Sequence, residues 1–246
     1  MKIVVSIIIP FYSNINLLKK TVKSVLNQTF KKYEIIIIHD NPKLLTNNFK
    51  NIFQSKKNFK IIYNKKNVGA GLSRNKGIHI SKGKYVAFVD SDDIWNNNKL
   101  IKQINFMERY KYLATHTSYD RVDFNGKLIS TRVAKNLDYK RLLNSCDIGL
   151  SSVILNKRIL KKKIEFPTLK TKEDYVLWLK IAKTGVIFYG IKSRLMKWHN
   201  TPNSLSKSNF NKLTDAFKVY YNYEKISFIK SILRVFILSV NFLKKN

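Results

Sequence analysis

An unbroken apolar run near the start of the chain constrains its fold more than any other feature. Residues Ile3 to Ile9 are apolar except for Ser6. A run of this kind, without alternation, predicts a strand that is covered on both faces of a sheet. Apolar residues then recur at helical spacing, with Asn14 as the predicted N-cap of a helix. They are Ile15, Leu18, Val22, Val25 and Leu26.

The same alternation of strand and helix continues through the first half of the chain. Strands are predicted at residues 33–38, 60–63 and 85–89, and a helix at 71–80. The second half is less regular, with predicted helices at 98–110 and 175–183 and strand-like segments at 115–122, 153–155 and 186–189. Strand–helix alternation indicates a parallel sheet with right-handed crossovers. We therefore predict an α/β fold with a mostly parallel sheet and flanking helices, in a single compact domain.

An acidic cluster, Asp90-Ser91-Asp92-Asp93, follows the predicted strand at residues 85–89. Three neighbouring carboxylates repel one another, and a divalent cation would relieve that repulsion. Mg²⁺ prefers oxygen ligands that it shares with the phosphates of a substrate. The cluster therefore indicates metal-assisted chemistry on a phosphorylated substrate. The alternative is a turn and helix cap, which Asp and Ser also favour.

Two other predicted strands also run into polar residues. The first ends in Pro10-Phe11-Tyr12-Ser13, and the second in His39-Asp40-Asn41. Ligands of open parallel sheets bind at the carboxyl ends of the strands. We therefore expect these residues and the acidic cluster to open onto one crevice. There the Asp40 carboxylate could accept hydrogen bonds from a base N–H or a ribose hydroxyl, although on its own it reads as an ordinary loop residue.

A glycine-containing segment at residues 67–77 enters the predicted helix at 71–80. Glycines such as Gly71 let the backbone approach a ligand, and helix N-termini favour anions. The segment matches neither the Walker A loop nor the G-x-G-x-x-G fingerprint. Arg74 is predicted to reach base or phosphate oxygens, or else to be a solvated helix charge.

Two further candidates lie in the second half. Thr171-Lys172-Glu173-Asp174 precedes an apolar helix, where Thr171 would serve as N-cap and the acids would complement the helix dipole. A carboxylate held at a helix start is also well suited to act as a general base. His199 lies in a predicted polar loop, where a structural role is the commoner one.

Composition limits the partners of the chain. The 246 residues include 47 Lys and Arg but 15 Asp and Glu, giving a net charge of +32. Such a surface attracts nucleic acid, anionic membranes or anionic small substrates. Cys146 is the only cysteine, which excludes an internal disulfide and suits a reducing compartment. The apolar N-terminal run is expected to be a strand rather than a signal peptide, because Pro10 cuts it short.

The C-terminal tail differs from the rest of the chain. From about Phe217 it is rich in apolar residues interleaved with Lys230 and Arg234. A basic amphipathic helix of this kind can lie on an anionic membrane surface. A terminal helix docked on the core or on a second subunit is the alternative. We predict a tail at residues 216–246 after a domain at 1–215, which divides into halves at 1–105 and 106–215.

Taken in order, several segments resemble the family 2 glycosyltransferases and their GT-A fold. The resemblance covers roughly residues 3–206 and combines six short motifs. They are Ile7-Ile8-Ile9-Pro10-Phe11-Tyr12, Ser24-Val25-Leu26-Asn27-Gln28-Thr29, residues 67–77, Val89-Asp90-Ser91-Asp92-Asp93, Glu173-Asp174 and Asn203-Ser204-Leu205-Ser206. Each motif alone is weak, and their shared order and spacing carry the resemblance.

The resemblance implies a role for each matching residue. The donor, a nucleotide-sugar, would be held by Pro10, Phe11, Tyr12, Asp40, Gly71, Arg74, Asp90, Ser91, Asp93 and His199. Asp90 and Asp92 would form the D-x-D motif and bind Mg²⁺ or Mn²⁺, chiefly through Asp92. Asp174, with Glu173 beside it, would deprotonate an acceptor hydroxyl. The implied reaction is a direct displacement that inverts the anomeric carbon.

The sequence departs from the family pattern after the second strand. The family has two acids and a glycine there, whereas this chain has His39-Asp40-Asn41-Pro42, which leaves base preference open. Residues 194–198 are similar to the Q-x-x-R-W of processive synthases. Without membrane spans to form a channel, we predict transfer of a single sugar.

The leading interpretation is a cytoplasmic enzyme, free or on the inner face of the membrane, that extends a surface glycan or a lipid-linked acceptor. One alternative is a basic nucleic-acid-binding protein, which explains the charge but not the acidic cluster. The other is a sugar nucleotidyltransferase, which would begin with a glycine-rich loop that this chain lacks. We expect no specific nucleic-acid partner, and the sequence does not indicate the donor sugar, the acceptor or the oligomeric state.

Overall fold

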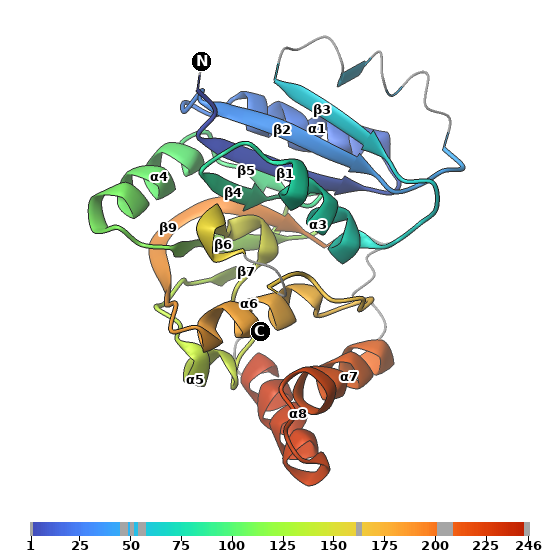
Figure 1. Ribbon diagram of the computed structural model, residues 1–246, viewed down its shortest axis with the longest axis vertical. Helices are drawn as coiled ribbons and strands as arrows, with labels where there is room; N and C mark the ends of the chain where they lie inside the picture. Colours follow the sequence, from blue (N-terminus) through green and yellow to red (C-terminus); the bar gives the residue numbers. More distant parts are fainter. Residues whose placement is uncertain are drawn as a thin grey trace.

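The computed structural model describes residues 2–44, 49, 52–53, 58–160, 164–200 and 209–243. Within these residues the chain forms one nine-stranded mixed sheet with helices on both faces (Figure 1). The strand order is β3-β2-β1-β4-β8-β6-β9-β5, and β7 pairs with β6 outside this path. The α/β class and the flanking helices are therefore as predicted.

The first half of the sheet is parallel. It contains β1 (Val5–Phe11), β2 (Tyr33–His39), β3 (Phe59–Tyr63) and β4 (Tyr85–Phe88). Helices α1 (Ile15–Leu26) and α3 (Ala70–Ile80) connect these strands. Because all four strands run the same way, their carboxyl ends meet at one edge. The strand order reverses between β1 and β4, where a parallel sheet usually opens a crevice.

The second half mixes strand directions. Strand β8 (Ile154–Asn156) is antiparallel to both β4 and β6 (Ala114–Val122), and β9 (Phe188–His199) is parallel to β6. Two antiparallel strands complete the sheet, β7 (Leu128–Arg132) against β6 and β5 (Ile94–Trp95) against β9. The helical segments here are α4 (Lys99–Tyr110), α5 (Tyr139–Leu142), η1 (Leu150–Ser152), η2 (Lys157–Ile159) and α6 (Glu173–Lys183).

The two faces of the sheet carry separate hydrophobic clusters. Ile7 and Ile9 of β1 pack in the cluster that includes α1 and α4, whereas Ile8 packs in the one that includes α6. Successive residues of a strand point to opposite faces, so a strand covered on both sides must be apolar throughout. The apolar N-terminal run is therefore a strand that is covered on both faces, as its sequence predicted.

The motif at residues 24–29 is structural. Ser24 Oγ accepts a hydrogen bond from the Trp95 amide at 3.1 Å. The Gln28 side chain donates to the Asn96 carbonyl at 2.7 Å and accepts from the Leu100 amide at 3.0 Å. These bonds tie α1 to β5 and to the start of α4. The chain that follows the acidic cluster is fixed in this way against the first helix.

The tail forms a helical unit that stands out from the sheet (Figure 1). It comprises α7 (Asn209–Lys218), the π-helical segment η4 (Val219–Tyr223) and α8 (Phe228–Leu243). Helix α7 thus begins seven residues before the tail expected at residues 216–246. Val219, Tyr220 and Leu238 are buried in the α6 cluster, so one side of the tail docks on the core. None of the described helices is both long and apolar enough to span a membrane.

The structure departs from the predicted elements in three places. Strand β9 is much longer than residues 186–189 and carries His199 as its last residue, not in a loop. Strands β5 and β7 were not predicted, because each is short or exposed. The predicted cap at Thr171 is wrong. Lys172, with φ of 65°, is the N-cap of α6, and the Thr171 hydroxyl donates to Asp215 at 2.9 Å.

Candidate functional site

The acidic cluster lies where the sequence places it, beyond the carboxyl end of β4. Phe11 pairs with His39 across β1 and β2, and Ile8 pairs with Phe88 across β1 and β4. The ends of all three strands therefore meet at the edge where strand order reverses. Asp90 follows Val89 directly at this edge. The predicted crevice-forming segments are thus brought together.

Ser151 organises the cluster. Its hydroxyl accepts a hydrogen bond from the Asp90 amide at 3.0 Å and donates to Asp93 Oδ2 at 2.6 Å. Asp93 Oδ1 accepts from the His199 amide at 3.1 Å, and the Asp93 side chain is fully buried. Asp93 thus joins the end of β9 to the cluster, while Asp90 and Asp92 remain half-buried at the surface of the site.

The carboxylates of the cluster are chemically suited to a divalent cation. Burial raises the pKa of Asp93 well above its usual range, and the charges of Asp92 and Asp90 raise it further. A cation beside Asp90 and Asp92 would offset this repulsion, and Mg²⁺ usually takes only one or two carboxylates together with phosphates. The described residues contain no group of three or more His, Cys, Asp or Glu arranged as a metal site.

Arg74 joins the acidic cluster to the predicted base. One guanidinium nitrogen lies 2.7 Å from Asp90 Oδ1 and another 2.7 Å from Glu173 Oε1. The side chain is only 4% exposed, and its guanidinium carbon lies 5.3 Å from the centroid of the Phe166 ring. Burial lowers the pKa of Arg74, but the charges and hydrogen bonds of the two acids outweigh it, so the pKa is raised above its usual value. A buried arginine of this kind is a bridge between carboxylates, not a solvated helix charge.

Asp174, the predicted base, has a raised pKa. It lies in the first turn of α6 and is partly buried, and its Oδ1 accepts from the Tyr175 amide at 2.7 Å. Burial raises its pKa to about 7, and the neighbouring charge of Glu173 adds to the effect. Arg74 and Lys172 oppose it. A carboxylate with a pKa near neutrality can accept a proton and release it again.

Asp40 holds the glycine-containing segment in place. Its Oδ1 accepts from the Asn64 side chain at 2.7 Å and from the Val68 amide at 2.9 Å, and its Oδ2 accepts from the Gly69 amide at 2.8 Å. Gly69, the N-cap of α3, has a φ of 88°, which favours glycine. Asp40 is buried beneath this segment, so three protein donors use its oxygens.

The remaining donor-site candidates differ in exposure. Pro10 and Phe11 are buried in β1, and Phe11 packs against His39 with ring centroids 5.3 Å apart. Tyr12 is 52% exposed, so of the two aromatic residues here it is the accessible one. Gly71 lies against α6, since a Cβ there would meet Glu173 Cγ at 3.1 Å. Ser91 follows Asp90 in the turn and is half-buried.

His199 lies beside the acidic cluster. Its ring interacts with the backbone of Asp92, while burial and the charges of Lys197 and Lys20 lower its pKa. A neutral imidazole at this position can donate or accept a hydrogen bond. The predicted loop at residues 203–206 lies outside the described part of the chain.

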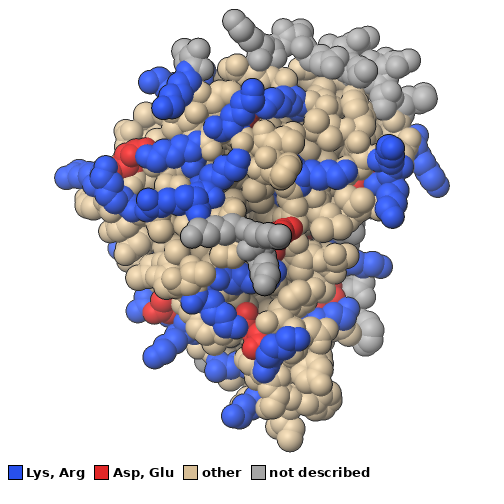
Figure 2. Space-filling model, in the orientation of Figure 1, with Lys and Arg blue, Asp and Glu red and all other residues tan. Residues whose placement is uncertain are grey.

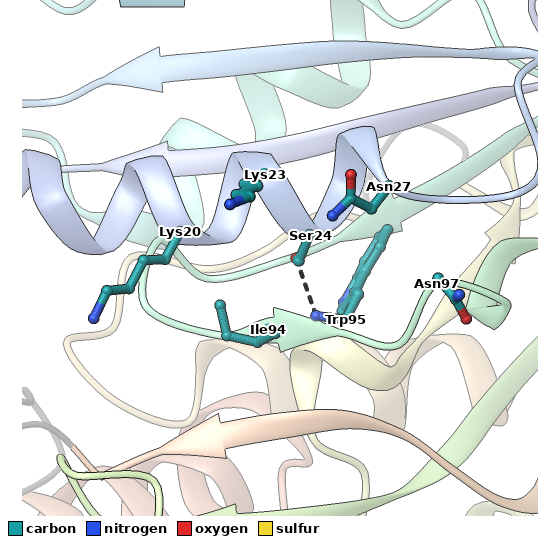
Figure 3. Close-up of a pocket in the computed structure, with 7 residues that line it drawn as sticks. All are labelled: Lys20, Lys23, Ser24, Asn27, Ile94, Trp95 and Asn97. Atoms are coloured by element: carbon teal, nitrogen blue, oxygen red, sulfur yellow. Dashed lines mark hydrogen bonds between the residues drawn. The ribbon is translucent and has the colours of Figure 1, made fainter.

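A shallow hollow runs between α1 and β5, close to this side of the site. Figure 3 shows Lys20, Lys23 and Ser24 of α1 and its C-cap Asn27 facing Ile94, Trp95 and Asn97. It contains none of the predicted site residues, and its polar contact is the Ser24–Trp95 hydrogen bond that ties α1 to β5. The hollow therefore borders the site without forming part of it.

Sequence reasoning missed three supporting residues: Ser151, Asn64 and Phe166. Ser151 lies in a short run of small polar residues before β8, a pattern without a distinctive signal. Asn64 directly follows β3 and donates to Asp40 at 2.7 Å, so the rule about strand ends could have found it. Phe166 belongs to an irregular segment, and only its contact with Arg74 reveals its role.

Comparison with known sequences identifies related proteins. The chain is 30% identical over 236 residues to the putative teichuronic acid biosynthesis glycosyltransferase TuaG of Bacillus subtilis, covering 94% of this chain and 92% of that one. It is 39% identical over 187 residues to WfaP of Escherichia coli, a UDP-Glc:α-D-GlcNAc-diphosphoundecaprenol β-1,3-glucosyltransferase, covering 74% and 71%. Against some longer relatives it spans only about a third of their length.

Solved structures share the fold. A complex of Staphylococcus aureus TarS with UDP-GlcNAc matches with a TM-score of 0.72 at 19% identity, covering 96% of this chain and 70% of that one. A mannosyltransferase of Pyrobaculum calidifontis in complex with GDP-Man and Mn²⁺ matches with a TM-score of 0.70 at 12% identity and the same coverage. The family model for glycosyl transferase family 2 matches residues 6–165, and the chain belongs to that family.

Proposed function

We propose that the protein transfers one sugar from a nucleotide-sugar to a hydroxyl of a glycan or lipid-linked acceptor, with inversion at the anomeric carbon. The Arg74 bridge is the observation that carries this proposal. It holds Asp90 of the acidic cluster and Glu173 beside the base on one buried guanidinium. A donor phosphate at the acidic cluster would then lie on one side of Arg74, and an acceptor hydroxyl at Asp174 on the other.

The donor would lie at the carboxyl ends of β1, β2 and β4. Tyr12 is placed to stack on the base because it is the exposed aromatic there. Asp40 and the glycine-containing segment at residues 67–77 that it holds would bind the nucleotide. His199 would lie at the diphosphate. Asp92 and Asp90 would hold Mg²⁺ or Mn²⁺. Such an ion offsets the charge that develops on a departing diphosphate.

Asp174 would remove the proton of the acceptor hydroxyl. As that proton moves to the carboxylate, the oxygen attacks the anomeric carbon from the face opposite the phosphate. The bond from the anomeric carbon to the diphosphate oxygen breaks, and the nucleoside diphosphate leaves with the electron pair. Glu173, paired with Arg74 at 2.7 Å, keeps the guanidinium in place beside the base.

The relatives and the tail support the proposed acceptor class. WfaP is named for a diphosphoundecaprenol acceptor, and TuaG for teichuronic acid biosynthesis. We therefore propose a role in surface polysaccharide synthesis at the cytoplasmic face of a membrane.

The exposed apolar side of α8 supports membrane contact, with Ile229 80% and Phe236 65% exposed. Pelleting with phosphatidylglycerol vesicles should be lost in Ile229→Glu/Phe236→Glu but kept in Lys102→Glu/Arg109→Glu.

The enzyme assignment is tested by a thermal-shift screen of nucleotide-sugars with Mn²⁺, followed by detection of the glycosylated product. A bound donor should raise the Tm, because a ligand that binds only the native state stabilises it. Donor binding should persist in Asp174→Asn while transfer is lost. The absence of a shift with every nucleotide-sugar would refute the proposal, whereas loss of donor binding in Asp174→Asn would make Asp174 structural.

A further inference from the structure

The helical tail contacts the chain immediately before the proposed base. The Thr171 amide and the Thr171 hydroxyl both donate to Asp215 Oδ2 of α7, at 3.1 and 2.9 Å. Asp215 lies 44 residues beyond Thr171 in the sequence, whereas Asp174 follows Thr171 by one helical turn. The tail therefore holds the segment that leads into the base.

Asp215 is committed to this contact. The chain has 47 Lys and Arg against 15 Asp and Glu, and basic side chains spread over the face that Figure 2 shows. Asp215 instead lies inside the fold and is only 5% exposed. Its Oδ1 pairs with Lys218 of the same helix at 3.1 Å, which leaves Oδ2 to accept both hydrogen bonds from Thr171. Partners of this kind are what a buried carboxylate requires.

The start of α6 depends on restraint from outside the helix. Its N-cap residue, Lys172, has a φ of 65°, a left-handed conformation that residues other than glycine seldom adopt. Within the described part of the chain, the Lys172 side chain makes no capping hydrogen bond. Such a backbone conformation persists only where the surrounding structure fixes it. The two hydrogen bonds to Asp215 fix Thr171, the residue directly before Lys172, and so supply this restraint.

A second contact with the tail lies directly after the base. Tyr175 of α6 and Tyr220 of η4 are both fully buried, and their hydroxyl oxygens lie 3.1 Å apart. Each hydroxyl also donates to a backbone carbonyl at the end of α5, Tyr175 to Leu142 at 2.5 Å and Tyr220 to Leu143 at 2.9 Å. The tail thus holds the chain on both sides of Asp174.

We infer that the tail is part of the active site, with Asp215 as the positioning residue that keeps Asp174 in place for proton transfer. A general base must lie within hydrogen-bond reach of the proton that it removes. Asp174 is carried by the first turn of α6, which Asp215 anchors through Thr171. This inference rests on the proposed function, in which Asp174 is the base, and it is independent of any contact between the tail and a membrane.

The test compares two buried tail carboxylates that hold opposite ends of α6. Asp215→Ala removes the contact before the base. The matched control is Glu224→Ala, because Glu224 pairs with Lys183 at 2.8 Å, at the last residue of the helix. Lys183 lies roughly 14 Å from Asp174 along the helix axis, at about 1.5 Å per residue. Both variants should lower the Tm, since each loses a buried contact between the tail and the core.

Only Asp215→Ala should also slow the reaction. The readout is hydrolysis of the nucleotide-sugar that raises the Tm most in the thermal-shift screen. Water then replaces the acceptor, Asp174 takes its proton, and the free sugar and the nucleoside diphosphate are released. We expect kcat to fall about 10–10²-fold with the donor Kd unchanged, because a displacement of about 1 Å can have an effect of this size. An equal fall in Glu224→Ala would overturn the inference.

Two milder variants keep the test informative if Asp215→Ala folds poorly. Asp215→Asn should retain most of the rate, because its amide oxygen can still accept both hydrogen bonds from Thr171. Thr171→Val removes one of these bonds and no charge, so its rate should lie between those of Asp215→Ala and the unmodified protein. A rate in Asp215→Asn as low as in Asp215→Ala would show that charge, not hydrogen bonding, is what matters, and would overturn the inference.

The pKa of Asp174 reports on the contact. Burial is the largest influence on this carboxylate and raises its pKa to about 7. The charge of Glu173 raises it further, whereas the charges of Arg74 and Lys172 lower it. The Asp174 charge also reaches the Cys146 thiol, but burial raises the pKa of that thiol to about 12, so it stays neutral near pH 7. A looser first turn of α6 would let water reach Asp174 and would lower its pKa.

The pH profile of hydrolysis is therefore a readout that lower stability alone would not change. In Asp215→Ala the acid side of the profile should move to lower pH. In Glu224→Ala and in Asp215→Asn it should stay in place, and the second of these controls for the charge that is lost with Asp215. An unshifted profile in Asp215→Ala would overturn the inference, as would the same shift in Asp215→Asn.

A calorimetric cycle separates this inference from the proposed function, because it needs no turnover. At pH 8, Asp174→Asn should raise the Tm of the unmodified protein and of Glu224→Ala, since it removes a buried carboxylate with a raised pKa. In Asp215→Ala the gain should be much smaller, because water already reaches that carboxylate. Equal gains in all three backgrounds would refute the inference and leave the enzyme assignment intact. A smaller gain without binding of any nucleotide-sugar would instead support the contact and refute the enzyme assignment.

Discussion

The two halves of the sheet concentrate opposite charges at the site. The parallel half, β1 to β4, ends in carboxylates, with Asp90, Asp92 and Asp93 beyond β4. The mixed half carries Arg121 on β6 and Arg132 on β7. The neighbouring carboxylates of the acidic half repel one another, and their charges raise the pKa of Asp93 beyond the effect of its burial. Under the proposed function, the acidic half would hold a metal ion and the donor, and the mixed half would hold the acceptor.

Removal of the proposed base, Asp174, should have the largest effect on turnover. Asp174 lies where the two halves of the site meet. Asp174→Asn should lower kcat by up to about 10⁴-fold, the upper range for general base catalysis, with donor binding retained. In the unmodified enzyme kcat/KM should fall below about pH 7, because the raised pKa of Asp174 leaves it protonated there. An unchanged rate at pH 5 would show that the base lies elsewhere.

The acidic half is tested by Asp92→Asn. We expect turnover to fall by about 10²–10³-fold, since the ion would contribute several kcal/mol of charge stabilisation. The fold should be kept, as the circular dichroism spectrum would show. Glu108→Gln is the matched control, because Glu108 on α4 pairs with Lys84, which precedes β4, away from the carboxyl ends of the strands. Full metal-dependent activity in Asp92→Asn would remove the metal assignment.

The link between the halves is tested by Arg74→Met. The change would leave Glu173 and Asp90 without their shared cation, which for buried pairs costs about 3–5 kcal/mol. At about 2–4 °C per kcal/mol, the Tm should fall by roughly 10 °C. The acid limb of the rate profile should also move to higher pH, because Arg74 lowers the pKa of Asp174. If the acid side of the pH–rate profile did not shift, Arg74 would have no effect on the pKa of the base.

The nucleotide end of the acidic half is tested by Asp40→Asn. The new amide would face at least one of three hydrogen-bond donors now directed at the carboxylate. An unmatched buried polar group costs about 1–3 kcal/mol, so the donor KM should rise about tenfold while kcat changes little. A reduced kcat with unchanged KM would place the effect at the reacting atoms instead.

The smallest expected effect is the pH dependence of protein stability that arises from Asp174. Because the folded pKa of Asp174 is raised, the native state binds more protons than the unfolded state between about pH 4 and 7. This contribution to stability is present at low pH and is lost as the pH rises through about 7. Asp174→Asn should therefore raise the Tm by a few degrees at pH 8 and have less effect at pH 5, as scanning calorimetry would show.

The acidic half was more predictable than the mixed half. Its strands are apolar runs followed by polar residues, and parallel strands bring such ends together whatever their separation in sequence. Arg121 and Arg132 carried no comparable signal, since 47 Lys and Arg are spread along the chain. Only the pairing of β6 with β7 brings them together. Ser151 and Phe166 were missed likewise, because long-range packing places them.

The Arg74 bridge has a consequence for protein engineering. Arg74 and Glu173 are 99 residues apart in the sequence yet lie 2.7 Å from each other. A chimera that takes the proposed acceptor half from another family member would be joined between these two positions. Such a hybrid inherits the arginine from one parent and its glutamate from the other. Matched bridge residues in both parents are therefore the first requirement for exchanging acceptor specificity between these enzymes.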